Sequence, residues 1–131
     1  PRFRWIVILG GVGLFLWLSL EDYAPLSAVI AGSALTLLLA YAAITAWWGG
    51  KTLSPSAWWV AAGVGGALIG GGAAVISAAL MLFKNGMHAH LFPDYPPGLI
   101  LAMLERTPVW ALAGALIGVA LLLLHQPRYE I

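Results

Sequence analysis

The chain has 131 residues, of which 62% are hydrophobic and 8% are charged, with a net charge of +1 and no cysteine. Soluble domains average about 25% charged residues, so this composition excludes an ordinary soluble domain and indicates an integral membrane protein. The lack of cysteine excludes disulfides and thiolate metal sites, and the lack of a basic run excludes nucleic acid as a partner.

The first predicted element is a membrane-spanning helix over residues 3–20. No charged residue lies between Trp5 and Leu20, and the flexible side chain of Arg4 can keep its charge out of the hydrocarbon. Basic residues before an apolar run also begin signal peptides, but residues 18–21 match the A-x-A pattern of a cleavage site poorly. We therefore expect this helix to be retained as a span.

The second predicted span covers residues 25–48, inside a long charge-free run. Pro25 suits the first turn of a helix, where its missing N–H is not needed. Glu21 and Asp22 come just before it, where the helix dipole favours negative charge. These two acids therefore have a structural explanation that requires no active site.

The third predicted span covers residues 56–83 and contains an unusual density of glycine. Ser54 and Pro55 mark its start as an N-cap followed by a helix-compatible proline. Small residues recur in steps of three and four and so share one face. These are Gly63, Gly66, Gly70, Ala73 and Ser77. Such a face lets helix backbones approach closely in a membrane.

The segment 84–106 holds most of the polar residues, and we predict an outer loop and a short helix there. Asn85-Gly86 predicts the end of the preceding helix, and three prolines follow it. Leu99–Leu104 is apolar throughout, which predicts a short helix that lies on the outer membrane surface or dips into it, with Glu105 and Arg106 at its wet end.

The last predicted span covers residues 108–125 and starts after Thr107-Pro108. It carries the pair Gly114 and Gly118, a second small-residue face. Residues 114–118 repeat residues 66–70 letter for letter, which is explained by chance or by an ancient duplication. Together these elements predict one all-α domain over residues 1–131 with four transmembrane helices and a short interfacial helix.

Basic and aromatic residues predict the orientation. The predicted inner side carries Arg2, Arg4, Lys51 and Arg128. The other side carries two basic residues and four acids. This bias places both termini in the cytoplasm, and we expect a bacterial inner membrane. The predicted interface anchors are Trp5, Trp47, Trp48, Trp58, Trp59 and Trp110.

His88, His90 and Asp94 form the candidate metal or cofactor site. A catalytic zinc takes about three protein ligands, which these residues just supply, although their spacing matches no standard motif. One histidine alone could hold a chlorophyll-type pigment or haem through an axial imidazole. Our expectation is neither metal nor cofactor, with both histidines hydrogen-bonded to the loop or to a partner.

No interior position of a predicted span carries Asp, Glu, Lys, Arg or His, which argues against a proton-coupled carrier. No spacing of nucleophile, base or paired acids specifies a reaction, so we expect no enzymatic activity. The leading hypothesis is an accessory subunit of a larger membrane complex, respiratory or photosynthetic, that contacts other membrane subunits and lipids. The alternatives are a small oligomeric transporter or channel, and a pigment- or haem-binding subunit.

Overall fold

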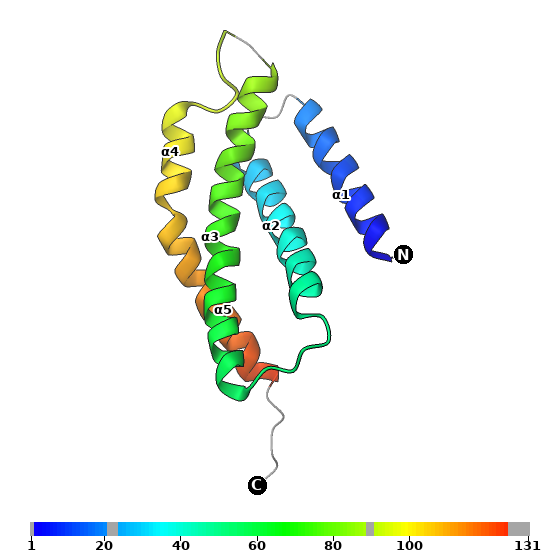
Figure 1. The fold of residues 1–131 in the computed structure, drawn as a ribbon. Coiled ribbons are helices and arrows are strands. Elements are labelled where there is room, and N and C mark those ends of the chain that lie inside the picture. The colour runs from blue at the N-terminus through cyan, green and yellow to red at the C-terminus, as the bar shows by residue number, and fades with distance from the viewer. Residues whose placement is uncertain (1, 21–23, 89–90, 126–131) are drawn as a thin grey trace.

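The computed structural model describes residues 2–20, 24–88 and 91–125, and the side chains from residue 4 onward. Every regular element in these ranges is an α-helix, as predicted (Figure 1). The helices are α1 (Arg2–Ser19), α2 (Pro25–Trp48), α3 (Pro55–His88), α4 (Pro97–Glu105) and α5 (Thr107–His125).

Three helices, α2, α3 and α5, are long and apolar enough to cross a membrane. The part of α1 whose side chains are described, Arg4–Ser19, is a shorter apolar helix. All 18 residues of α1 would measure about 27 Å at about 1.5 Å per residue, against about 30 Å for the hydrocarbon core. The structure therefore supports three of the four predicted spans by length and composition.

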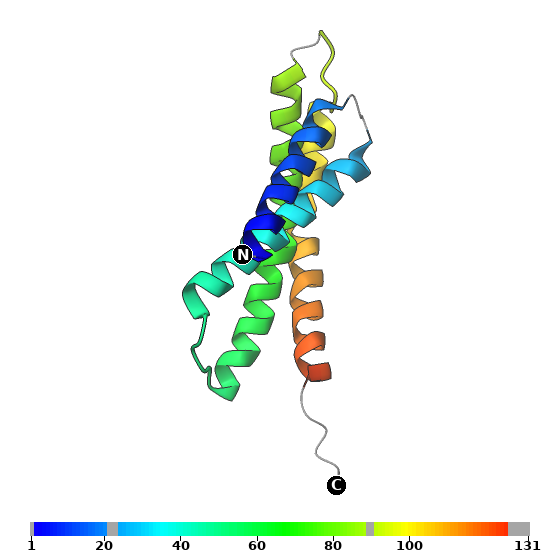
Figure 2. The same cartoon turned by 90° about the vertical axis from the view of Figure 1, so that its right-hand side faces the viewer.

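The central helix is α3, and the other helices are arranged around it. α2 packs along one side of α3, while α4 and α5 follow one another along another side (Figures 1 and 2). α1 leans against α2, and Leu18 is the one buried side chain among its described residues. The bundle thus has a tightly packed centre and one loosely attached helix.

The helix α3 continues through Asn85 and Gly86 to His88, so the predicted end at residue 83 is wrong. The Asn85 side chain does not cap its own helix, because it is hydrogen-bonded to the backbone of Tyr95. The 34 residues of α3 would measure about 51 Å. Such a helix extends well beyond the hydrocarbon core unless it is strongly tilted.

The helix α4 is present as a short helix, as predicted, and it runs along α3. Its residue Met103 is buried against Ala74 and Ala78 of α3. The chain then turns at Arg106, and α5 continues in the same general direction (Figure 2). Pro108 lacks an N–H and interrupts the regular helical hydrogen bonding, which explains the break between the two helices.

The break between α4 and α5 lies level with the middle of the bundle. A Cβ built on Gly71, at the midpoint of α3, would lie 3.5 Å from the methyl carbon of Thr107. A Cβ built on Gly72 would lie 3.3 Å from the methyl carbon of Thr36, at the midpoint of α2. The middles of α2 and α3 and the start of α5 are therefore at one height.

Candidate functional site

The helices α3 and α5 meet backbone to backbone through what we call the glycine contact. It consists of Gly66, Gly70, Gly114 and Gly118. A Cβ on Gly66 would overlap the carbonyl oxygen of Gly114, and a Cβ on Gly114 would overlap the carbonyl oxygen of Gly66. A Cβ on Gly70 would likewise meet the carbonyl oxygen of Trp110. No side chain larger than hydrogen fits at these positions.

The glycine contact is antiparallel and locally twofold. The Cβ directions of Gly66 and Gly114 are occupied by Cα hydrogens, which therefore point at the carbonyl oxygens of the facing helix. Such Cα–H···O contacts recur at close helix–helix interfaces, and each contributes about 0.5–1 kcal/mol. The identical segments 66–70 and 114–118 face each other because each needs the same smooth surface.

The remaining residues of the predicted small-residue face contact different neighbours. A Cβ on Gly63 would reach only Val119 of α5, at 3.9 Å. Ala73 and Ser77 are buried, and a Cβ on Gly32 of α2 would lie 2.7 Å from the Cα of Ser77. The predicted stripe therefore divides between α5 and α2.

Two cavities lie between the helices, and both are apolar. The larger, about 1010 Å³, lies between α2 and the first half of α3, and its lining includes Trp47 and Trp48. The smaller, about 600 Å³, lies between α1 and α2. The described residues lining them include no His, Asp, Glu, Lys or Arg. These cavities suit hydrocarbon better than water, ions or a ligated cofactor.

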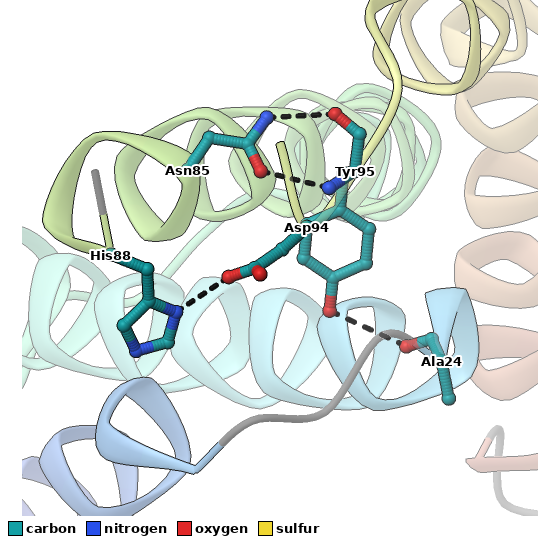
Figure 3. Close-up of polar contacts among 5 residues, drawn as sticks. All are labelled: Ala24, Asn85, His88, Asp94 and Tyr95. Atoms are coloured by element: carbon teal, nitrogen blue, oxygen red, sulfur yellow. Dashed lines mark hydrogen bonds and ion pairs between the residues drawn. The ribbon is translucent and has the colours of Figure 1, made fainter. Parts of the chain in front are cut away.

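A group of polar side chains fastens the end of α3 to the segment before α4. We call it the polar cluster, and it consists of Lys84, Asn85, His88, Asp94 and Tyr95. Figure 3 shows that the Asn85 side chain makes two hydrogen bonds with the backbone of Tyr95, donating at 2.7 Å and accepting at 2.8 Å. The Tyr95 hydroxyl donates to the carbonyl oxygen of Ala24 at 3.5 Å. The cluster thus joins α3, the loop and the start of α2.

The titratable side chains His88, Asp94 and Lys84 of the polar cluster are largely buried. His88 Nδ1 lies 2.5 Å from Asp94 Oδ2, while Asp94 Oδ1 is buried without a hydrogen-bond partner among the described residues. Lys84 is fully buried, and its ammonium lies 4.5 Å from the ring centroid of Trp17 in α1. A cation over an indole face is stabilised electrostatically, so this contact also ties the end of α1 to α3.

The polar cluster includes two of the three predicted ligands. His88 and Asp94 come together, whereas His90 lies outside the described residues. Within the described ranges, no group of three His, Cys, Asp or Glu is placed to hold a metal ion. The contacts of His88 and Asp94 fit a role in fastening the loop to α3.

Five of the six predicted tryptophan anchors are exposed, and one has a different position. Trp5, Trp47, Trp48, Trp58 and Trp59 are all exposed. Trp110 packs against the buried cluster of Ala74 and Ala78 near the middle of the bundle. It is therefore a packing residue between α5 and α3, and its role as a membrane-interface anchor stays a prediction.

Glu105 and Arg106 lie at mid-height on the outside of the bundle. Both are exposed, and Arg106 immediately precedes Thr107, which lies against the midpoint of α3. Half of a hydrocarbon core is about 15 Å thick, so a bilayer centred on α2 and α3 places both charges inside it. The wet location of these two charges stays a prediction, as does the absence of charged residues and histidine from the interior of the spans.

The sequence signal for the break between α4 and α5 is Pro108, which cannot continue regular helical hydrogen bonding. The helix α5 that follows the break is by itself long and apolar enough to cross a membrane. Comparison of the chain with protein-family models, with curated proteins and with solved structures finds no match.

Proposed function

We propose that this chain is a non-enzymatic structural subunit of a larger membrane protein complex, in which other membrane subunits and lipids surround its helices. The observation that carries the proposal is the exposure of Glu105 and Arg106 at mid-height. An arginine at the centre of a spanning helix costs about 2.5–3.5 kcal/mol on insertion scales. Ionisable residues at this depth normally face protein or water, so a partner protein covering this face removes the cost.

The weak attachment of α1 supports the same proposal. Only Leu18 is buried among its described side chains, and a Cβ on Gly11 or Gly13 would meet nothing within 4 Å. In the complex, α1 serves as the fourth span, its length of about 27 Å being nearly matched to the bilayer. Neighbouring subunits then fill the space beside it.

The proposed orientation keeps both termini in the cytoplasm of a bacterium with the chain in the inner membrane. With Glu105 and Arg106 inside the bilayer, the basic residues of the connecting segments divide four to one. The cytoplasmic side then has Arg2, Arg4, Lys51 and Arg128, and the other side has Lys84. This bias follows the positive-inside rule.

Gentle extraction tests the subunit proposal. Membranes solubilised in digitonin should yield the chain in a species much larger than a monomer or dimer, together with other membrane proteins. Changing both Glu105 and Arg106 to leucine should release it from that species, since the charges no longer need a partner. A chain that runs alone in digitonin and gives no cross-link to another protein in intact membranes would contradict the proposal.

A second candidate function is a small oligomeric transporter, and Glu105 favours it. A carboxylate at membrane depth beside a proline-broken helix is a common element of coupled transport paths. The apolar lining of both cavities disfavours a polar path within one chain. Reconstitution in liposomes decides between the candidates: proton flux that Glu105→Gln abolishes would support the transporter.

The pigment- or haem-binding alternative receives less support from the geometry. The lining residues of the two cavities include no histidine, and His88 is engaged with Asp94. An absorption spectrum of the gently extracted protein tests this alternative. A visible absorption band that is lost in the His88→Leu variant would support the pigment- or haem-binding alternative.

A further inference from the structure

We infer that a second copy of this chain covers the exposed face of α4 and α5, with reciprocal ion pairs between Glu105 of one copy and Arg106 of the partner subunit. This inference rests on the proposed function, because it identifies one partner that packs on the chain within its complex. It would also hold if the copies formed a dimer with no further subunits.

The exposed face is a continuous stripe along the α4–α5 unit. Its members are Leu101, Glu105, Pro108, Leu112 and Leu116, all exposed and spaced in steps of four, three, four and four. Residues at these spacings lie on one side of a helix. The stripe differs from the glycine contact in the size of its side chains. The glycine contact has none, whereas in the stripe leucine side chains lie on either side of the charged Glu105 at mid-height.

The two charges do not form an ion pair with each other in the described part of the chain. Adjacent helical residues point in directions about 100° apart and do not face one another. Within the described part of the chain, neither Glu105 nor Arg106 has an ion-pair partner. Two opposite charges therefore stand side by side on the surface, each requiring a complementary group at the same depth.

A second copy supplies both complementary groups at once. A twofold axis along the membrane normal keeps equivalent residues of the two copies at equal depth, and twofold contacts are self-complementary. Glu105 then meets the partner's Arg106, while Arg106 meets the partner's Glu105. A partner of different sequence would need its own acid and base in the reverse arrangement, whereas the copy has them already.

Reciprocal charge exchange tests the pairing. Glu105→Arg places two arginines opposite two arginines in a homodimer, and Arg106→Glu places acids opposite acids. Each variant alone should lose dimer, with a dissociation constant raised at least about tenfold, since polar contacts between membrane helices are individually modest but here become repulsive. The two variants expressed together should form a mixed dimer, because every contact is then between an arginine and a glutamate.

The measurement uses full-length chains with two different affinity tags, expressed in one membrane, with co-purification in mild detergent and cross-linking in the intact membrane. The double exchange Glu105→Arg with Arg106→Glu in one chain should restore the homodimer. Lys51→Glu, which reverses a charge in the connection between α2 and α3, is the matched control and should leave dimer formation unchanged. Tryptophan fluorescence during unfolding checks that each variant still packs.

Three results would overturn the inference. The first is a single-exchange variant that dimerises like the wild type. The second is failure of the mixed pair to co-purify although the wild-type chains do. The third is a wild-type chain that cross-links only to a different protein, which would leave the subunit proposal standing while replacing the second copy with that protein.

Discussion

Two regions of α3 are held to their neighbours in opposite ways. Its first half meets α5 through Gly66 and Gly70, where backbone touches backbone and no side chain intervenes. Its last turns meet the loop and α1 through the side chains of Asn85, His88 and Lys84, which make hydrogen bonds and a cation–π contact. In hydrocarbon, helices associate mainly through close van der Waals contact, whereas polar fastening suits the helix end that extends toward water.

The largest expected effect comes from breaking the glycine contact. Gly66→Leu forces a side chain into the carbonyl oxygen of Gly114, which belongs to a rigid helix and cannot move aside. Overpacking typically costs about 1–3 kcal/mol, and we expect a loss at the upper end of this range or beyond. Unfolding in mixed detergent micelles, followed by tryptophan fluorescence, measures it.

The neighbouring glycine is the matched control for this experiment. A Cβ on Gly65 would meet nothing within 4 Å, so Gly65→Leu should change stability by less than about 0.5 kcal/mol in the same assay. Equal losses for the two variants would mean that glycine content, and not the contact with α5, governs stability.

A smaller loss is expected at the contact between α2 and α3. Gly32→Ala brings a methyl group against the Ser77 backbone, whose Cα would lie 2.7 Å away. The strain should cost about 1–3 kcal/mol and loosen α2 while leaving the α3–α5 contact intact. Cysteine pairs introduced across each interface, with the rate of disulfide formation as readout, would separate the two effects; slower coupling at both interfaces would refute this separation.

The side-chain contacts at the end of α3 should contribute no more than the contact between α2 and α3, and their loss should have a more local effect. Asn85→Ala removes both hydrogen bonds to the Tyr95 backbone, and net contributions of about 0.5–1.5 kcal/mol per bond predict a loss of about 1–3 kcal/mol. Faster hydrogen exchange of the Tyr95 amide is the specific readout. Asn85→Asp keeps an acceptor for that amide, so protection should persist there; exchange as fast as in the alanine variant would contradict the assigned geometry.

The smallest effect should follow loss of the indole beneath Lys84. Trp17→Leu keeps an apolar side chain but removes the cation–π contact, which contributes about 0.5–2 kcal/mol. Because α1 is otherwise loosely held, the expected result is easier proteolysis before α2 with little change in global unfolding. Trp5→Leu, at the exposed start of α1, is the control; equal protease sensitivity in both variants would remove the role assigned to Trp17.

Much of the local structure followed from short sequence signals. Pro25 and Pro55 begin α2 and α3 as expected, because proline is compatible with a helix only in its first turn. The Asn85-Gly86 pair predicted a helix end that is wrong, because α3 continues to His88. The side chain of Asn85 binds the backbone of Tyr95, ten positions away, and no local rule identifies that partner. The direction of α4 was left open, since an apolar helix of nine residues suits either a membrane surface or a helix groove.

The amino-acid sequence by itself determined that this protein is helical and apolar enough for a membrane, since composition and charge-free runs act locally along the chain. It also determined that close helix contacts are present, because glycine at regular spacing has no other common use in a spanning helix. Only the tertiary structure decided which glycines touch a neighbour, as Gly65 and Gly66 differ merely in the direction they face. It likewise decided that Glu105 and Arg106 lie at mid-height in the bundle. Their height depends on the register between α4–α5 and α3, and contacts between residues far apart in the sequence determine that register.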